Sequence, residues 1–326
     1  MTVSSSSSGP APPERLVLAD LPSRADRLFR RVTSGAGLSV LALLIVIGFF
    51  LVYRSAPTFE ASGFGFFTTI QFDPASGHFG VLGLLYGTVV VALIAVAVAV
   101  PFSVLAALFI SDYASPRMRG FLTGLVDLLA AIPSLLYGLW GFSFLRPYIT
   151  PLSQWMTDNL GWFPLFETKP GAVLFNSMFV AGLVVSLMVI PITTSVIREV
   201  FTQTPPGEKE AALALGSTRW GMVRTVVLPF GRGGIVGGSM LGLGRALGET
   251  IAVSLLLPQV PELTTHLLEF GGATISGFIA NNAGQSGPAL SGLMAAGLVL
   301  FAFTLATNFT ASVIISRSRS GVGVDA

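Results

Sequence analysis

Two charged residues lie inside a long apolar stretch in the second half of the chain. Arg245 and Glu249 stand in the run from about Gly233 to Leu257, which contains no other charged residue. A charge near the centre of a membrane-spanning helix costs roughly 2.5–3.5 kcal/mol on insertion scales. If the stretch is one continuous helix, the i, i+4 spacing puts both side chains on one face, where each partly neutralises the other.

The chemistry of this pair allows a functional and a structural interpretation. An arginine that faces a translocation path can bind an oxyanion such as phosphate through two parallel hydrogen bonds. Glu249 can hold Arg245 in place, compete with the anion for it, or form part of a gate. A buried structural ion pair between helices explains the same two residues. Asp127 is a possible further path or gate residue that can also pair with Arg245 or simply reach the membrane interface.

Residue types that serve other chemistries are scarce. The chain has no cysteine, and its two histidines, His78 and His266, are far apart, so we expect no metal site and no thiol chemistry. The only lysines are Lys169 and Lys209, and neither lies in the G-x-x-x-x-G-K-[ST] loop that cradles nucleotide phosphates. We therefore expect no catalytic residue and no cofactor in this chain. Any ATP, with its Mg²⁺, would be hydrolysed by another subunit.

The composition indicates which elements must position these side chains. Of the 326 residues, 52% are hydrophobic and only 10% are charged, whereas soluble domains carry about 25% charged residues. This predicts an all-α membrane protein. Six apolar runs are long enough to cross a hydrocarbon core of about 30 Å as helices, at about residues 35–53, 81–110, 120–145, 171–197, 233–257 and 289–315.

The distribution of basic residues predicts the orientation of these spans. Most Lys and Arg residues lie in the two tails and in the connections between spans two and three and spans four and five. Because such residues accumulate on the cytoplasmic side, both termini should be cytoplasmic. We divide the chain into a mostly disordered tail (1–34), a first transmembrane helix with its external loop (35–80), a core of five transmembrane helices (81–316) with a cytoplasmic loop (198–232), and a C-terminal tail (317–326).

The cytoplasmic loop contains the signals of a short helix. Pro205 and Pro206 start a helix well, because their missing N–H groups fall in the first turn, where none is needed. Glu208 and Glu210 complement the positive end of the helix dipole. Gly216 supplies the left-handed residue that ends the helix.

Small residues cover the expected surface of this helix, namely Ala211, Ala212 and Ala214. Small side chains allow the groove of another protein to approach closely. Ser217 is expected to cap the helix that follows and enters the membrane. On physical grounds alone, a helix that merely links two spans is equally consistent with this segment.

The loop resembles the EAA loop of type I ABC importer permeases. The family pattern E-A-A-x3-G-x9-I-x-L-P is matched with one conservative departure, Val226 in place of isoleucine. By this resemblance the loop is the coupling helix that docks into a separate ATPase subunit. The residues that carry the pattern are Glu210, Ala211, Ala212, Gly216, Leu228 and Pro229.

Two further segments resemble the PstC family of phosphate-specific ABC permeases. Residues 242–253 resemble its G-L-G-R-A-x-G-E-T-M-A-V signature, and residues 127–141 resemble its I-P-S-x-x-Y-G-L-W-G segment. The likeness runs from about Phe79 to Ile315. It implies the type I ABC importer permease fold, a multi-pass location in a bacterial plasma membrane and inward transport of inorganic phosphate. The intramembrane arginine and glutamate of the family correspond to Arg245 and Glu249.

The same resemblance implies an assembly and a mechanism. The partners would be a PstA-like permease, two PstB-like ATPase subunits and an extracytoplasmic PstS-like phosphate-binding protein. ATP-driven closure of the ATPases would move the coupling helix and produce alternating access. Three alternatives stay open: a permease of this fold for another oxyanion such as sulfate or molybdate, an ion-coupled secondary transporter or channel, and a scaffold that reports phosphate status.

Overall fold

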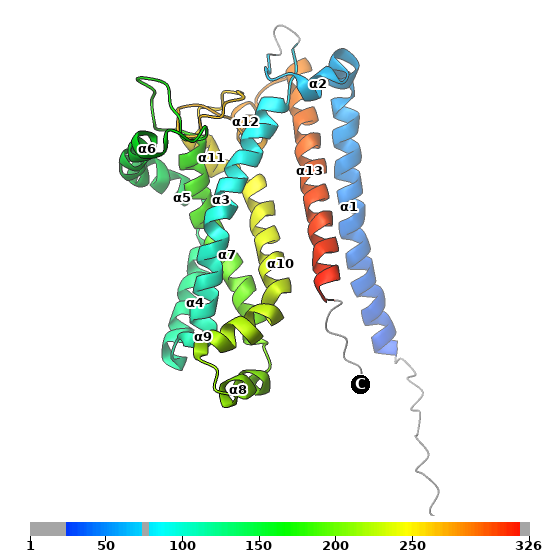
Figure 1. Cartoon of the computed structure of the whole chain (residues 1–326). Helices are drawn as coiled ribbons and strands as arrows, with labels where there is room; N and C mark the ends of the chain where they lie inside the picture. Colours follow the sequence, from blue (N-terminus) through cyan, green and yellow to red (C-terminus); the bar gives the residue numbers. More distant parts are fainter. Residues whose placement is uncertain (1–23, 74–77, 320–326) are drawn as a thin grey trace, which may run out of the picture. The chain divides into compact units, whose positions relative to one another are not determined.

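The computed structural model of the chain is built almost entirely from helices (Figure 1). It describes residues 24–73 and 78–319, with side chains as far as Val313. The chain divides into two compact units, residues 1–49 and 50–326. The first long helix, α1 (Arg24–Ser62), contributes to both units. All site residues discussed below lie in the second unit.

The predicted spans correspond to long helices with different ends. Five helices are long and apolar enough to cross a membrane, and a sixth span results if one bent pair of helices counts as one. The elements that follow α1 are α2 (Gly65–Thr68), α3 (Leu82–Leu108), the π-helical η1 (Phe109–Tyr113), α4 (Pro116–Ala131), α5 (Ser134–Trp140), the π-helical η2 (Gly141–Leu145), α6 (Arg146–Leu160), α7 (Met178–Thr202), α8 (Pro206–Ala214), α9 (Arg219–Met222), the π-helical η3 (Val223–Val227), α10 (Leu228–Leu247), α11 (Ile251–Leu256), α12 (Ile275–Asn281) and α13 (Pro288–Arg319).

The tails differ from the sequence-based boundaries where the structure describes them. Helix α1 begins at Arg24, so the last part of the segment 1–34 is the start of the first long helix, and residues 1–23, including the expected disordered part, lie outside the described residues. At the other end, α13 continues to Arg319, and the rest of the expected C-terminal tail lies outside the described residues.

The third predicted span is broken near its middle. Helices α4 and α5–α6 meet at an angle of 88° at Pro133. Proline ends a helix because it lacks the N–H group and its ring clashes with the preceding turn. The last carbonyl groups of α4 therefore lose their helical partners, and the Tyr137 hydroxyl donates a hydrogen bond of 2.9 Å to the carbonyl oxygen of Leu129. A residue that follows the proline thus supplies a partner for a carbonyl group of the helix that precedes it.

The core is a layer of helices centred on α7. Helix α3 packs along α7, and α10 packs against both (Figure 1). Valine and alanine side chains of both helices belong to one apolar cluster, for example Val91 and Ala95 of α3 and Val184 and Val185 of α7, all of them buried. Buried apolar side chains of this kind fix the long helices relative to one another, so that the polar residues among them have defined positions.

Glycine residues bring α10 unusually close to α7. The closest approaches are spaced at about four residues along one face of α10, at Gly231, Gly234, Gly238 and Gly242. A Cβ atom at Gly242 would lie only 2.7 Å from Thr193 Oγ1 and from Val189 Cγ1. The expectation that glycines of this stretch let neighbouring helices approach is confirmed.

The fifth span begins earlier and ends earlier than predicted. The apolar helix runs from Arg219 to Leu247, through α9, η3 and α10. Residues 248–250 are not helical, and α11 begins only at Ile251. The expected continuous helix from Gly233 to Leu257 is therefore wrong, and the break falls between the two charged residues.

Candidate functional site

Arg245 lies in the last turn of α10. Helix α10 ends at Leu247, and Gly248 caps it with its N–H group on the carbonyl oxygen of Gly244, at 3.3 Å. The C-terminal end of a helix carries a partial negative charge, so a cation is stabilised in this position. The side chain of Arg245 is half-buried, and its Nε atom is buried without a hydrogen-bond partner among the residues that the structure describes.

Glu249 lies after the break, and its side chain accepts a hydrogen bond from the first turn of the next helix, α11. Its side chain is buried, with 7% of the residue exposed, and Oε1 accepts a hydrogen bond of 3.1 Å from the N–H group of Ala252 in the first turn of α11. A carboxylate at a helix N-terminus is stabilised by the free N–H groups and the dipole there. The Ser276 hydroxyl of α12 donates to the main-chain oxygen of Glu249 at 2.6 Å, which fixes the break from the opposite side.

The two charges therefore do not form the expected pair on one helix face. Within the described part of the chain, no ion pair joins Arg245 to Glu249 or to another carboxylate. Each charge instead lies at the helix end whose dipole favours it. A broken helix of this kind inside a membrane protein is tolerated where the freed polar groups are buried in protein or line a cavity. The N–H group at Nε of Arg245 is therefore a hydrogen-bond donor without an acceptor among the described residues.

The segment that follows Pro133 packs directly against this break. A Cβ atom at Gly138 of α5 would lie 2.7 Å from the Cα atom of Ala252, and one at Gly141 would collide with Val184 of α7. The two segments that carry the family signatures are thus neighbours in space.

Asp127 does not reach Arg245. It lies on α4 with 54% of its side chain exposed, and its Oδ1 atom accepts a hydrogen bond of 3.0 Å from the Ser195 hydroxyl of α7. The same oxygen lies 4.0 Å from Nη2 of Arg198, also on α7. The possible pairing of Asp127 with Arg245 is wrong. A gating role of Asp127 at the seam between α4 and α7 stays a prediction.

The loop at residues 198–232 folds into the helix that its sequence predicts. Pro206 is the first residue of α8, and Gly216 has φ = +85° just after its end. The N–H group of Ser217 bonds to the carbonyl oxygen of Ala212, and that of Gly216 bonds to Leu213. This pattern is the Schellman motif, which requires a left-handed residue and therefore favours glycine.

The surface of α8 differs in two details from the prediction. Ala212 is half-buried and packs against an apolar cluster that contains Met222 and Val223, so only Ala211 and Ala214 are fully exposed. The cap of the next helix is Thr218, whose hydroxyl accepts from the N–H group of Gly221 at 3.1 Å, and not Ser217. Glu210 is exposed, whereas Leu228 and Pro229 lie at the start of α10.

Apolar side chains remain exposed around α8. Leu215 is 89% exposed, Trp220 is 57% exposed and Leu213 is 43% exposed. Large apolar side chains that are this exposed on a loop between long helices can be covered by another protein.

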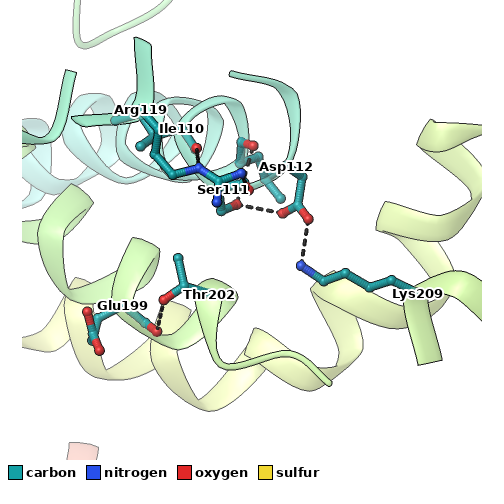
Figure 2. A network of polar contacts seen from close by, with 8 residues as sticks. Ile110, Ser111, Asp112, Arg119, Glu199, Thr202 and Lys209 are labelled. Carbon is teal, nitrogen blue, oxygen red and sulfur yellow. Dashed lines mark hydrogen bonds and ion pairs between the residues drawn. The ribbon is translucent and has the colours of Figure 1, made fainter. Parts of the chain in front are cut away.

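The sequence interpretation missed an ionic contact that attaches α8 to the ends of two other helices. Nζ of Lys209 donates a hydrogen bond of 2.6 Å to Oδ1 of Asp112 in η1 (Figure 2). Arg119 of α4 donates to the carbonyl oxygens of Ile110 and Ser111 in the same segment. Two signals were present: Asp112 directly follows the second apolar run, and Lys209 is one of only two lysines.

A pocket of about 740 Å³ is lined by residues of the segments 69–71 and 261–270 together with Lys169. Glu269 lies on its wall, with Oε1 accepting from the N–H group of Lys169 and Oε2 lying 3.7 Å from Nδ1 of His266. Within residues 24–73 and 78–319, no group of three or more His, Cys, Asp or Glu side chains is placed to hold a metal ion.

Comparisons with known proteins agree with this architecture. The family model of the binding-protein-dependent transport system inner membrane component matches residues 99–320. The phosphate transport system permease protein PstC 2 of Mycobacterium tuberculosis is 42% identical over 306 residues, which cover 91% of this chain and 94% of that protein. The phosphate transport system permease protein PstC of Xylella fastidiosa is 38% identical over 298 residues, which cover 90% and 92% of the two chains.

A solved structure shares the fold. A chain in the crystal structure of a bacterial ABC transporter involved in the import of the acidic polysaccharide alginate superposes with a TM-score of 0.54 at 19% identity, and the match covers 89% of this chain and 99% of that chain. This likeness supports the fold alone, which is that of a type I ABC importer permease with several membrane-spanning helices. The chain therefore belongs to the binding-protein-dependent transport system inner membrane components and, within them, to the PstC permease proteins of the plasma membrane.

Proposed function

We propose that this chain is a transmembrane permease subunit of an ATP-driven importer of inorganic phosphate. The observation that carries the proposal is the identity of 42% with a phosphate transport system permease protein over nine-tenths of both chains. The break between Arg245 and Glu249 supports it, because this break places a cation with an unused hydrogen-bond donor among the central helices. The chain itself breaks no bond.

In this proposal Arg245 is the residue that meets phosphate on its path. Its guanidinium group offers a planar set of donors that match two oxygens of a phosphate ion. Glu249 is engaged by the N–H group of Ala252 and does not neutralise the arginine in this conformation. Arg245 can therefore exchange one anion for another, whereas a tight ion pair with Glu249 would have to be broken first.

Helix α8, with Glu210 and the exposed apolar side chains that include Leu215, is the surface that docks into an ATPase subunit. An exposed leucine and tryptophan outside the membrane would be covered in such a complex. Hydrolysis of ATP, with its Mg²⁺, takes place in the two partner ATPase subunits, and this chain holds no cofactor. A second, PstA-like permease completes the path.

The remaining parts of the assembly follow from the orientation. We place both termini and the loop 198–232 in the cytoplasm and the pocket near Glu269 on the outside. The extracytoplasmic phosphate-binding protein would deliver its ligand at that outer end. Residues 35–80 then form the first span with its external loop, and residues 81–316 form the permease core.

The test is uptake of labelled phosphate by cells that lack this chain, with and without the restored gene and its partners. Restored uptake that depends on ATP and resists an excess of sulfate or molybdate supports the phosphate importer. Loss of label uptake to either competitor would keep the permease but change its substrate. Uptake that needs no ATPase subunit would favour an ion-coupled transporter.

A further inference from the structure

The ionic contact between Lys209 and Asp112 joins α8 to the membrane-spanning helices across 97 residues of sequence. The nitrogen and oxygen atoms lie 2.6 Å apart, which is short for an N–H···O bond, as expected in direction when both groups are charged. The side chain of Asp112 is only 5% exposed and that of Lys209 is 20% exposed. Solvent and salt therefore screen this attraction much less than they screen a surface ion pair.

Asp112 is itself held firmly by its neighbours. The hydroxyl group of Ser111 donates to Oδ2 of Asp112 at 2.5 Å, so that both carboxylate oxygens have a partner. Arg119 of α4 donates to the carbonyl oxygens of Ile110 at 3.0 Å and Ser111 at 2.6 Å. These carbonyl groups belong to the end of a helix and would otherwise lack partners. Figure 2 shows that the contacts converge on one short segment, so η1 fastens the end of α3 to the start of α4.

Helix α8 has few other attachments. Its half-buried Ala212 packs with Met222 and Val223 on the side of the following helix. On the side of α3, a pocket of about 330 Å³ separates the elements, lined by residues that include Thr202, Thr204 and Pro206 besides the ion pair. Because apolar packing does not fill this space, the contact between Lys209 and Asp112 bridges it.

We propose that the ion pair of Lys209 and Asp112 is a strut that makes α8 move as one body with the adjoining ends of α3 and α4. This proposal rests on the proposed function, in which α8 receives the movement of an ATPase subunit. Lys209 and Asp112 are positioning residues: neither touches the ATP nor the transported ion. Without the strut, α8 can shift into the neighbouring pocket while α3 and α4 stay where they are.

The first experiment measures how much phosphate is transported for each ATP hydrolysed by the full complex, with its binding protein, in proteoliposomes. We expect Lys209→Met and Asp112→Asn each to lower this ratio roughly fivefold or more, the lower end of typical coupling effects. Lys209→Arg, which keeps a cation opposite Asp112, is the matched control and should retain most of the ratio. The exchanged pair Asp112→Lys with Lys209→Asp should recover part of the ratio, which a loss of folding would not.

The second experiment measures the distance directly and does not depend on transport. The chain contains no cysteine, so Asp112→Cys with Lys209→Cys gives a unique pair for a short thiol crosslinker. We expect an equal crosslinking yield with and without ATP. The crosslinked complex should transport more phosphate for each ATP hydrolysed than the same double-cysteine variant without the crosslinker. A crosslinking yield that changes when ATP is added overturns the proposal, and so does a crosslink that abolishes the coupling of transport to ATP hydrolysis. An unchanged ratio of phosphate transported per ATP in both single variants overturns it as well. Failure of the unaltered complex to transport phosphate would instead overturn the proposed function, while the crosslinking yield still tests the strut.

Discussion

Arg245 and Glu249 are four residues apart, yet a break in the helix gives them different roles. Arg245 lies in the last turn of α10, and Glu249 accepts a hydrogen bond from Ala252 at the start of α11. Both positions agree with the helix dipoles, which favour a cation at the end of one helix and an anion at the beginning of the next. The arrangement leaves the Nε atom of Arg245 buried and without a hydrogen-bond partner among the described residues, and we propose that this donor meets the transported anion.

The substitution Arg245→Gln should leave insertion and assembly intact but reduce phosphate uptake by roughly 10- to 100-fold, since a hydrogen bond to a charged group contributes about 1.5–3 kcal/mol. Arg245→Lys keeps the charge without the planar set of donors and should retain an intermediate rate. Uptake of labelled phosphate at equal amounts of assembled complex measures the effect. A wild-type rate for the glutamine variant would leave Arg245 a purely structural role.

Glu249 should contribute to stability mainly through the hydrogen bond that its oxygen accepts, and its charge at the start of α11 should add less. Glu249→Gln preserves an acceptor for the N–H group of Ala252, whereas Glu249→Ala removes it. Loss of such a cap costs about 0.5–2 kcal/mol. The thermal unfolding temperature of the purified complex should therefore fall for the alanine variant and change little for the glutamine variant. Equal losses in both variants would show that the carboxylate charge is what matters.

Glu210→Arg should uncouple ATP hydrolysis from transport, because it reverses the charge of an exposed residue on the proposed docking face of α8. Uptake should fall while the ATPase activity of the complex persists. Glu208→Arg changes the same charge elsewhere on α8 and is the matched control. If the Glu210 variant transports as much phosphate per ATP as the unaltered complex, α8 does not act as the coupling helix.

The close approach of α10 to α7 predicts a difference between two neighbouring glycines. A Cβ atom at Gly242 would lie 2.7 Å from Thr193 Oγ1, whereas one at Gly244 would lie 3.5 Å from Asn308 Oδ1. Gly242→Ala should therefore destabilise the protein by about 1–3 kcal/mol, the usual cost of overpacking. Gly244→Ala should be tolerated. Thermal unfolding of the two variants checks the prediction, and an equally stable Gly242 variant would contradict the packing described here.

Much of the architecture could be predicted from the sequence because it depends on local signals. The apolar runs are long, and the scarcity of charged residues within them allows few alternatives to membrane-spanning helices. The start of α8 at Pro206 and its end before Gly216 follow from the restricted backbone of proline and the permissive backbone of glycine. The resemblance to a known family rests on the same local segments, and the comparisons confirm it.

The break between Arg245 and Glu249 could not be predicted in this way. The residues on both sides are apolar or small, and no proline marks the position. Helix α11 forms separately because it packs against Gly138 of α5, and Ser276 of α12 donates to the main-chain oxygen of Glu249. These contacts come from segments distant in sequence.

The partners of the polar side chains were likewise decided by the tertiary structure. The sequence by itself determined which charges lie in or beside the membrane, since residue types and apolar runs are local properties. Asp127 meets Ser195 and Arg198, and Lys209 meets Asp112, only because the packing of α3, α4 and α7 brings their ends together. A charged group in a medium of low polarity is stabilised by whichever partner the fold places within reach, and distance along the chain does not specify that partner.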